Sequence, residues 1–275
     1  MENKETKLTK KMYAACATRE WGRLVQDPFH RLEFETTMRY LKKHLPKNGL
    51  ILDAGGGPGR YTIELAKLGY DVVLLDLVPE NLDFAQKQIA KSGMTKRIKR
   101  IDPGTITDLS RYPGNSFDAV ICLGGPLSHV HPAKMRAKAV SELLRVAGRN
   151  APVFVSVMGK YGVMLATPEG WPREVNDKKA FQRFSRTGDD YHWCGHGYCH
   201  FFTAQELKTL FSESKAKTLE MVGLEGLNSS CRITNQFAKE YPKAWKNWVD
   251  AHYQICTQPS VVDASGHMMI IVRKK

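Results

Sequence analysis

The stretch ILDAGGGPGRYT, residues 51–62, has the residue types of a ligand-binding turn. It places four glycines within five positions, directly after an aspartate and an apolar run. Glycine lacks a Cβ and adopts backbone angles that other residues avoid, so a ligand can lie directly against such a loop. A turn alone needs fewer glycines. We therefore predict that Gly55, Gly57 and Gly59 lie against a bound cofactor.

The spacing of these glycines separates two classes of nucleotide cofactor. A dinucleotide fingerprint, G-x-G-x-x-G, requires a glycine three places after Gly57, where this chain has Arg60. Asp53 precedes the loop, and its carboxylate would repel a pyrophosphate but attract an ammonium group. Asp76 ends the next apolar run and is placed for a ribose diol. These residues favour a cationic nucleoside cofactor.

Three histidines are candidate bases for proton transfer. His129 and His131 follow an apolar run at 117–123, and His200 opens the stretch HFFTAQEL. Histidine changes its charge near neutral pH, which suits a group that takes a proton from an acceptor hydroxyl. The alternative for each of them is a hydrogen-bonding role in a loop.

The segment HWCGHGYCH, residues 192–200, has the composition of a metal site. His192, Cys194 and His196 would share one face of a strand. Zinc sites usually combine such a pair with a second matched pair, which the other cysteines do not supply. We therefore predict no metal, and interpret the segment as a glycine-containing lid. Cys122, inside an apolar run, is interpreted as a packing residue.

Strand and helix patterns alternate through the centre of the chain. Apolar runs at 50–54 and 71–76 flank a helical pattern at 60–68, which makes a βαβ unit. Further strands are expected at 97–101, 117–123, 152–158, 216–224 and 267–275, and further helices at 79–93, 133–148 and 203–214. This order predicts an α/β fold with a doubly wound parallel sheet, whose strand ends carry the ligand.

Composition limits the class of protein. The 275 residues suit one main domain, and no apolar stretch approaches the roughly twenty residues of a spanning helix. The first residues lead into no apolar signal core, so we expect a cytoplasmic chain with no membrane partner and with free cysteine thiols. The net charge of +13 would suit RNA, but the basic residues recur at spacings typical of solvated helix faces. Nucleic acid stays an alternative partner, not the favoured one.

Several motifs resemble class I S-adenosylmethionine-dependent methyltransferases: LDAGGGPGRYTIELA, VVLLD, ITDLSRYPGNSFDAVICL and HFFTAQEL. The resemblance covers roughly residues 49–224 and the closing strand, and is strongest to the ubiquinone-biosynthesis (type 11) branch. It implies a Rossmann-like seven-stranded sheet with six parallel strands and an antiparallel last strand, and S-adenosyl-L-methionine as cofactor. The implied cofactor-binding residues are Asp53, Ala54, Gly55, Gly57, Gly59, Asp76, Leu77, Thr105, Ile106 and Leu123.

Two positions refine this resemblance. The family often has an acidic residue facing adenine after the third strand, whereas this chain has Thr105, whose hydroxyl can accept a hydrogen bond. After the fourth strand, methyltransferases that act on amino groups of nucleic-acid bases carry Asn or Asp, then Pro-Pro and an aromatic. Positions 124–126 are Gly-Gly-Pro, which argues against that substrate class.

The remaining segments are candidates for acceptor recognition. Residues 1–46 are interpreted as a helical cover, and 47–275 as the methyltransferase domain, with a helical insertion at 225–264. Arg23 and Arg31 in the cover could bind an anionic group on the acceptor or the cofactor carboxylate. Aromatic residues of both segments could line an apolar pocket: Trp21, Phe29, Trp245, Trp248 and Tyr253.

The expected function is methyl transfer to oxygen, nitrogen or carbon of a small-molecule acceptor. This chemistry is an in-line displacement, so the protein mainly aligns two reactants and excludes water. The alternatives are an RNA-modifying or RNA-binding protein that uses its basic surface, and a cofactor-binding regulator without catalysis.

Overall fold

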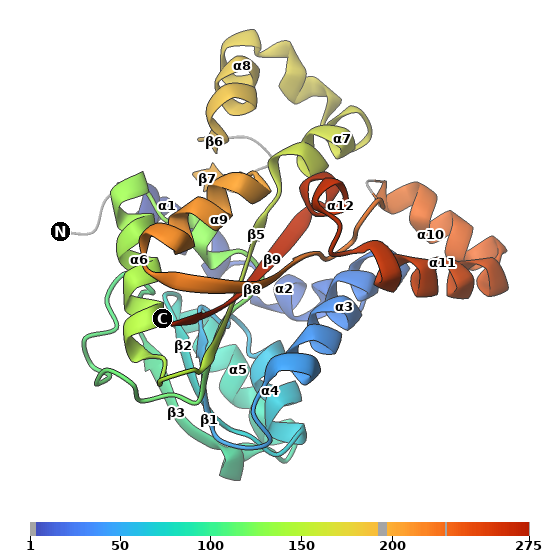
Figure 1. Cartoon of the computed structure of the whole chain (residues 1–275). Helices are drawn as coiled ribbons and strands as arrows, with labels where there is room; N and C mark the ends of the chain where they lie inside the picture. The colour runs from blue at the N-terminus through green and yellow to red at the C-terminus, as the bar shows by residue number, and fades with distance from the viewer. Residues whose placement is uncertain (1–3, 192–196, 229, 275) are drawn as a thin grey trace.

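A seven-stranded sheet forms the centre of the computed structural model, which describes residues 4–191, 197–228 and 230–274 (Figure 1). In spatial order the strands are β3 (Ile98–Pro103), β2 (Asp71–Asp76), β1 (Leu50–Ala54), β4 (Ala119–Cys122), β5 (Pro152–Met158), β9 (His267–Lys274) and β8 (Ala216–Gly223). β9 is antiparallel to β5 and β8, and the other strands share one direction. The predicted fold class is confirmed.

Alternating side chains bury both faces of the sheet. On β5, Val153 and Val155 belong to one apolar core, and Phe154 belongs to the opposite one. The first core includes residues of α6 (Ala133–Val146) and α9 (Ala204–Glu213). The opposite face is covered by α3 (Pro28–His44), α4 (Arg60–Lys67) and α5 (Pro79–Lys91). A sheet covered on both faces explains why its strands are nearly unbroken apolar runs.

The N-terminal segment, residues 1–46, contains three helices among its described residues. α1 (Lys4–Ala14) and α2 (Ala17–Arg23) lie near α5, and α3 begins after Asp27. The Asp27 side chain accepts a hydrogen bond from the His30 amide, and Pro28 occupies the first turn. A capping aspartate followed by proline is a strong helix start, which is why the cover breaks there.

Two further segments leave the sheet (Figure 1). The first segment follows β5 and projects away from the sheet, and it contains α7 (Lys160–Gly170), the 3-10 turn η3 (Pro172–Asn176) and α8 (Lys178–Thr187). A small two-stranded sheet follows, formed by β6 (Asp189–Asp190) and β7 (Cys199–His200). No helix was expected in this segment from the sequence. The predicted insertion contains three helices, α10 (Cys231–Glu240), α11 (Pro242–Ile255) and α12 (Pro259–Ala264).

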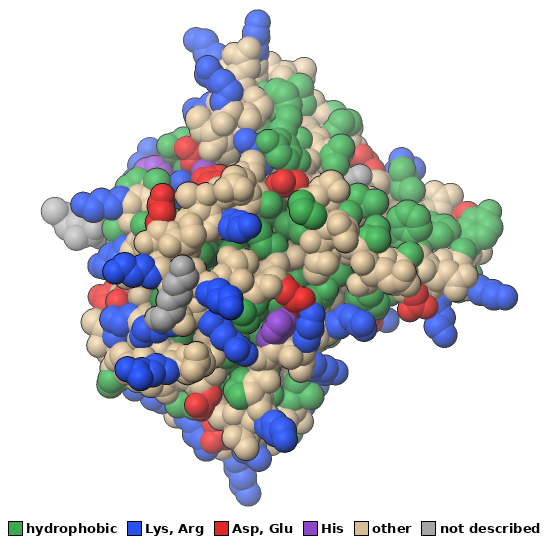
Figure 2. Space-filling model, in the orientation of Figure 1, with side chains coloured by type: hydrophobic (Ala, Val, Ile, Leu, Met, Phe, Trp, Pro, Cys, Tyr) green, Lys and Arg blue, Asp and Glu red, His purple; other side chains and the backbone are tan. Residues whose placement is uncertain are grey.

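The surface and the cysteines agree with the composition. Figure 2 shows Lys and Arg side chains spread over several separate elements of the visible face. Among the described residues, no disulfide joins Cys16, Cys122, Cys199, Cys231 and Cys256, and Cys122 is fully buried in β4. Within the described part of the chain, no helix is both long and apolar enough to cross a membrane.

Candidate functional site

A cavity of about 720 Å³ lies at the carboxyl ends of β1, β2, β3 and β4. The glycine loop after β1 forms part of its wall, and residues of α1 and α2 form another part. The volume lies in the range of small-molecule sites, and its place is the one at which open α/β sheets bind ligands. We call it the cofactor cavity.

The glycine loop presents bare backbone to this cavity. Gly55 and Gly57 have positive φ angles of 81° and 55°. A Cβ built on Gly57 has only the Asn81 side chain near it, at 3.9 Å, so a side chain there would extend into the cavity. Close approach of a ligand is a fitting reason for the glycine at position 57, whereas a Cβ on Gly55 would meet Pro126 at 2.6 Å.

Asp76 lies at the end of β2 and lines the cavity. One carboxylate oxygen accepts a hydrogen bond from the Gly57 amide at 2.8 Å, and the other accepts from the Val78 amide at 2.9 Å. Burial raises the pKa of Asp76, and these amide hydrogen bonds oppose that rise. Oδ1 also accepts a hydrogen bond from the Asn81 side-chain amide at 3.3 Å, so Oδ2 is the oxygen that keeps a lone pair for a ribose hydroxyl.

Asp53 lies behind the loop, not on the cavity wall. Its side chain is fully buried, and one oxygen accepts a hydrogen bond from the Thr62 hydroxyl at 2.6 Å. The other oxygen, Oδ1, is buried with no hydrogen-bond partner. Burial raises the pKa of Asp53 to about 7. A cationic group bound in front of the loop would stabilise this buried charge, which fits an ammonium-bearing cofactor.

Ala54 and Gly59, like Asp53, do not line the cavity. They lie behind the loop, and their contact with the cofactor stays a prediction. Gly59, for example, begins α4 with a φ of 81° and faces Ala85 of α5. The remaining predicted cofactor residues do line the cavity, and they are Gly55, Gly57, Asp76, Leu77, Thr105, Ile106 and Leu123.

Thr105 lines the cofactor cavity and also forms hydrogen bonds with a neighbouring residue, Thr107. Its Oγ1 lies 3.0 Å from the Thr107 Oγ1 and accepts a hydrogen bond from the Thr107 amide at 3.3 Å. Gly104, Thr105, Ile106 and Thr107 together line the side of the cavity after β3. This side fits the predicted position of an adenine ring.

His129 and His131 both line the cofactor cavity. His129 ends the 3-10 turn η2 (Pro126–His129) after β4, with Nδ1 3.0 Å from the Tyr198 carbonyl oxygen and Nε2 2.9 Å from the Tyr13 hydroxyl. The His131 ring packs edge-on against Tyr198, at 4.4 Å between centroids. Both are therefore placed on the wall of the cofactor cavity, and their role as bases stays a prediction.

His200 lies away from both cavities. Its side chain is buried, with Nδ1 2.8 Å from Asp189 and Nε2 2.7 Å from Glu206, and it lines neither cavity described here. Burial alone would lower the pKa of His200, but its hydrogen bonds to the two carboxylates raise it. With both ring nitrogens held by carboxylates, His200 links β7 to α9 and has no free nitrogen to act as a base.

The two predicted arginines also differ. Arg23 lines the cofactor cavity, whereas Arg31 is exposed and donates a hydrogen bond to the Val25 carbonyl oxygen. Arg23 donates two hydrogen bonds to Glu33, at 2.5 and 3.0 Å. Arg31 lies outside both cavities, and Arg23 is held by a carboxylate of its own chain. Their role in substrate binding stays a prediction.

A second cavity, of about 380 Å³, adjoins the first. The two share Tyr13, Glu20, Arg23 and Gly124 in their walls. The second cavity has apolar walls from several elements, among them Phe29, Met158, Val163, Trp171 and Phe201. Of the aromatic residues predicted to line a pocket, only Phe29 does so here. Trp21, Trp245, Trp248 and Tyr253 line neither cavity.

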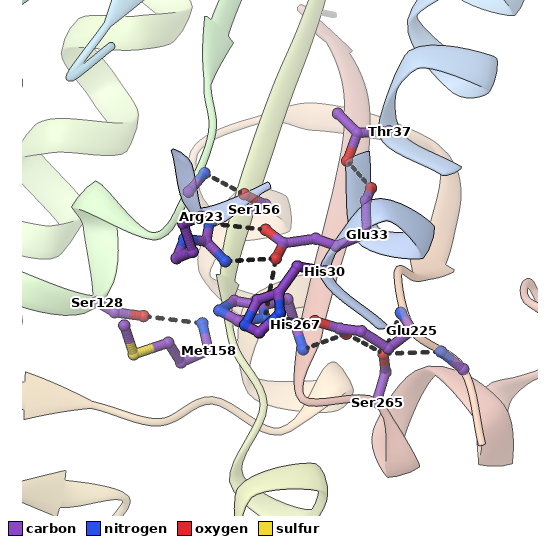
Figure 3. A network of polar contacts seen from close by, with 12 residues as sticks. Arg23, His30, Glu33, Thr37, Ser128, Ser156, Met158, Glu225, Ser265 and His267 are labelled. Carbon is purple, nitrogen blue, oxygen red and sulfur yellow. Dashed lines mark hydrogen bonds and ion pairs between the residues drawn. The ribbon is translucent and has the colours of Figure 1, made fainter. Parts of the chain in front are cut away.

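A buried polar network lines one side of the second cavity (Figure 3). Beyond the Arg23–Glu33 pair, His267 Nδ1 lies 2.6 Å from Glu225 and 3.8 Å from Glu33. Burial alone would raise the pKa of Glu33, but Arg23 and His267 lower it to about 2. Burial would lower the pKa of His267, but Glu33 and Glu225 raise it. The network is thus a chain of compensated charges.

Two groups of described residues bring metal-ligand atoms within 4.8 Å of one another. They are Asp27 with His30 and Cys231, and Glu33 with Glu225 and His267. Arg23 already holds Glu33 through two hydrogen bonds, so a cation there would compete with the guanidinium. His192, Cys194 and His196, the predicted candidates for a metal, lie outside the described residues.

Sequence reasoning missed Tyr13, Glu33 and His267. A signal for Glu33 exists in α3, whose buried face carries Glu33, Thr36 and Thr37 beside apolar residues. Polar residues on a buried helix face require partners, and they indicate a network. Tyr13 carries no such signal, because it lies in a polar segment and its partner is 116 positions away.

Several known proteins that are similar to this chain are methyltransferases. A family model described as a methyltransferase domain matches residues 51–149. The ubiquinone biosynthesis O-methyltransferase of Xanthomonas oryzae pv. oryzae is 30% identical over 235 residues, covering 83% of this chain and 89% of its own. The glycine/sarcosine N-methyltransferase of Parasynechococcus marenigrum is 30% identical over 148 residues, covering 54% of this chain.

Coverage of other relatives is smaller. The chain spans 51% of the Parasynechococcus enzyme and 59% of the ubiquinone biosynthesis O-methyltransferase of Xanthomonas axonopodis pv. citri. Among solved structures, a SAM-dependent methyltransferase from Methanosarcina mazei has a TM-score of 0.58 at 20% identity, covering 86% of this chain and 96% of its own. That likeness shows the fold. Together with the Xanthomonas oryzae match, it places this chain among the class I S-adenosylmethionine-dependent methyltransferases.

Proposed function

We propose that this chain binds S-adenosylmethionine in the cofactor cavity and transfers its methyl group to a small molecule held in the second cavity. The observation that carries the proposal is the shared wall. Both cavities are lined by Tyr13, Glu20, Arg23 and Gly124. A molecule bound in one cavity would therefore lie next to a molecule bound in the other at these residues. When bound, the cofactor supplies an activated methyl group on a sulfonium sulfur.

The protein's contribution is alignment and exclusion of water. The glycine loop and Asp76 orient the cofactor from the sheet side, and α1 and α2 cover it from the other side. We propose residues 1–46 as this cover, and residues 47–275 as the methyltransferase domain. Within the insertion at 225–264, three residues line the second cavity, which we also call the acceptor cavity: Glu225, Asn228 and Cys231. No residue of α11 lines it.

A small acceptor suits the second cavity better than a nucleic acid. Its volume of about 380 Å³ fits a metabolite, and its walls are mainly apolar. The names of relatives include an O-methyltransferase and an N-methyltransferase of small molecules, so oxygen and nitrogen acceptors are both proposed. The rival, an RNA-modifying protein, rests on the net charge of +13. On the face that Figure 2 shows, the Lys and Arg side chains are spread over several elements.

Calorimetric titration tests the cofactor. We expect S-adenosylmethionine and S-adenosylhomocysteine to bind, and NAD not to bind; tight NAD binding would overturn the assignment. A second titration with unmodified RNA at rising salt addresses the rival. Methyl transfer to RNA with a steep loss of affinity in salt would favour the rival over a small acceptor.

A substitution in α7 tests the acceptor cavity. Ala166 lines the second cavity and not the first, and the neighbouring Leu165 is exposed. We expect Ala166→Phe to abolish transfer to small acceptors and leave S-adenosylhomocysteine affinity unchanged, because the added ring fills the acceptor cavity. Leu165→Phe, on the same helix, is the matched control. Full transfer by Ala166→Phe would place the acceptor elsewhere.

A further inference from the structure

Tyr13 and His129 form a hydrogen-bonded pair at the junction of the two cavities. The Tyr13 hydroxyl lies 2.9 Å from His129 Nε2, and the rings meet edge-on at 5.3 Å between centroids. Tyr13 comes from α1 and lines both cavities, whereas His129 comes from η2 and lines the cofactor cavity. The pair therefore joins the cover to the carboxyl end of β4.

The second nitrogen of His129 defines the direction of this hydrogen bond. Nδ1 lies 3.0 Å from the Tyr198 carbonyl oxygen, which can only accept, so Nδ1 carries a hydrogen and donates it. In the neutral imidazole Nε2 is then the acceptor, and the Tyr13 hydroxyl donates to it. The tyrosine oxygen keeps lone pairs that can accept from a third group.

The other residues at the junction are less suited to take a proton. Arg23 is a donor only, and it is held by Glu33 and lies 3.5 Å from Glu20. Gly124 has no side chain. Glu20 forms ion pairs with Arg19 and Arg23. Tyr13, which is connected to a basic nitrogen outside the second cavity, can take a proton and pass one on.

We propose that Tyr13 and His129 form a proton relay that deprotonates a hydroxyl acceptor during methyl transfer. This inference rests on the proposed function and names the residue that contacts the acceptor oxygen. The acceptor oxygen bonds to the methyl carbon as the carbon–sulfur bond breaks, and that electron pair stays on sulfur. The acceptor proton passes to the Tyr13 oxygen, and the Tyr13 hydroxyl proton passes to His129 Nε2.

The surroundings of the pair favour a concerted relay over a free tyrosinate. Burial raises the pKa of Tyr13 well above its usual range, and nearby Glu20 adds to that rise. Tyr13 therefore stays protonated and passes a proton only while it receives another. The described charged and titratable groups around the relay are Arg19, Glu20, Arg23, His131, Arg136, Tyr198 and Cys199.

The first test needs no acceptor. In protein labelled with ¹⁵N-histidine and saturated with S-adenosylhomocysteine, we expect the His129 resonances of a neutral ring protonated on Nδ1, with Nε2 accepting. Tyr13→Phe should shift the Nε2 resonance of the S-adenosylhomocysteine-saturated protein. A ring protonated on Nε2 would overturn the relay whatever the activity.

The second test is a pH profile of methyl transfer to 3,4-dihydroxybenzoate, a phenolic probe, with sarcosine as an amine probe. We expect Tyr13→Phe to lower kcat for the phenol about 100-fold near pH 7, within the range of general base catalysis. Near pH 10, where phenols ionise without help, the variant should approach the wild type. Tyr161→Phe, at an exposed tyrosine of α7 that lines neither cavity, is the control.

The outcomes separate the relay from the proposed function. An equal loss at every pH would mean that Tyr13 only holds α1 in place, and no loss would mean that another group takes the proton; either result overturns the relay while the proposed function stands. If the wild type binds neither S-adenosylmethionine nor S-adenosylhomocysteine, the proposed function fails and the relay fails with it.

Discussion

The cofactor cavity is built mainly from one βαβ unit and the loops after neighbouring strands, whereas the second cavity joins residues from α2, α3, α7 and the start of β9. In the first, bare glycine backbone and one carboxylate lie within a stretch of about 25 residues. In the second, Glu33 and His267 meet although most of the chain separates them. A local motif thus encodes cofactor binding, and long-range packing encodes the acceptor site.

The largest effect is expected in the second region, from Glu33→Gln. The substitution removes the charge that Arg23 and His267 compensate, and breaking such a buried pair costs about 3 kcal/mol of unfolding free energy. Glu64→Gln, in an exposed pair with Lys67, is the control and should cost less than about 1 kcal/mol. Urea unfolding measures both.

The same variant sharpens the comparison between the cavities. We expect Glu33→Gln to keep its S-adenosylhomocysteine affinity at temperatures where it is folded. Loss of that affinity without loss of stability would assign the Arg23–Glu33 pair to the cofactor cavity instead of the acceptor cavity.

The contrast explains what could be predicted from sequence. The bounds of β1, β2 and β5 follow from apolar runs that the buried sheet requires, and Asp76 follows from its place at a strand end. The residues that lie outside both cavities could not be placed from the sequence, because their placement depends on the direction in which each side chain points. His200 and Arg31 have suitable chemistry in suitable segments, but their side chains point to Asp189 and to the Val25 carbonyl. Spacing in the sequence does not encode that orientation.

In the cofactor region, the strongest effect is expected from Gly57→Val. A valine would adopt a strained positive φ and extend into the cavity, so the Kd for S-adenosylhomocysteine should rise at least about 100-fold, which equals about 2.7 kcal/mol. Gly93→Val is the control, because Gly93 has a positive φ of 72° and a Cβ there has nothing within 4 Å. It introduces the same backbone strain at a position that does not line the cofactor cavity. Calorimetry should find the control unchanged, and an equal loss in both would point to strain alone.

A smaller effect is expected from Asp76→Ala. It removes the acceptor for the ribose, and hydrogen bonds to a charged group contribute about 1.5–3 kcal/mol, so affinity should fall about 10- to 100-fold. Asp102→Ala is the matched control, since Asp102 is buried in the next strand, accepts from Tyr112 and lines neither cavity. Unchanged cofactor affinity in Asp76→Ala, with normal thermal unfolding, would refute the ribose assignment.

The smallest effect concerns His200, which belongs to neither cavity. Its pKa is raised in the folded protein because Asp189 and Glu206 outweigh the effect of burial. The stabilisation is therefore fully present below about pH 6.5, the ordinary histidine value, and is lost as the pH rises through the raised folded value.

We expect His200→Gln to lower the unfolding free energy by about 1–2 kcal/mol at pH 6, a range reduced because Asp189 and Glu206 are partly exposed. The difference from the wild type should shrink by pH 9, since neutral His200 no longer pairs with two carboxylates. His252, whose burial lowers its pKa to about 4, titrates in both proteins and cancels in the difference. Urea unfolding at both pH values gives the two differences. A difference that stays constant with pH, combined with lost methyl transfer, would contradict the structural role. It would indicate that His200 acts in catalysis.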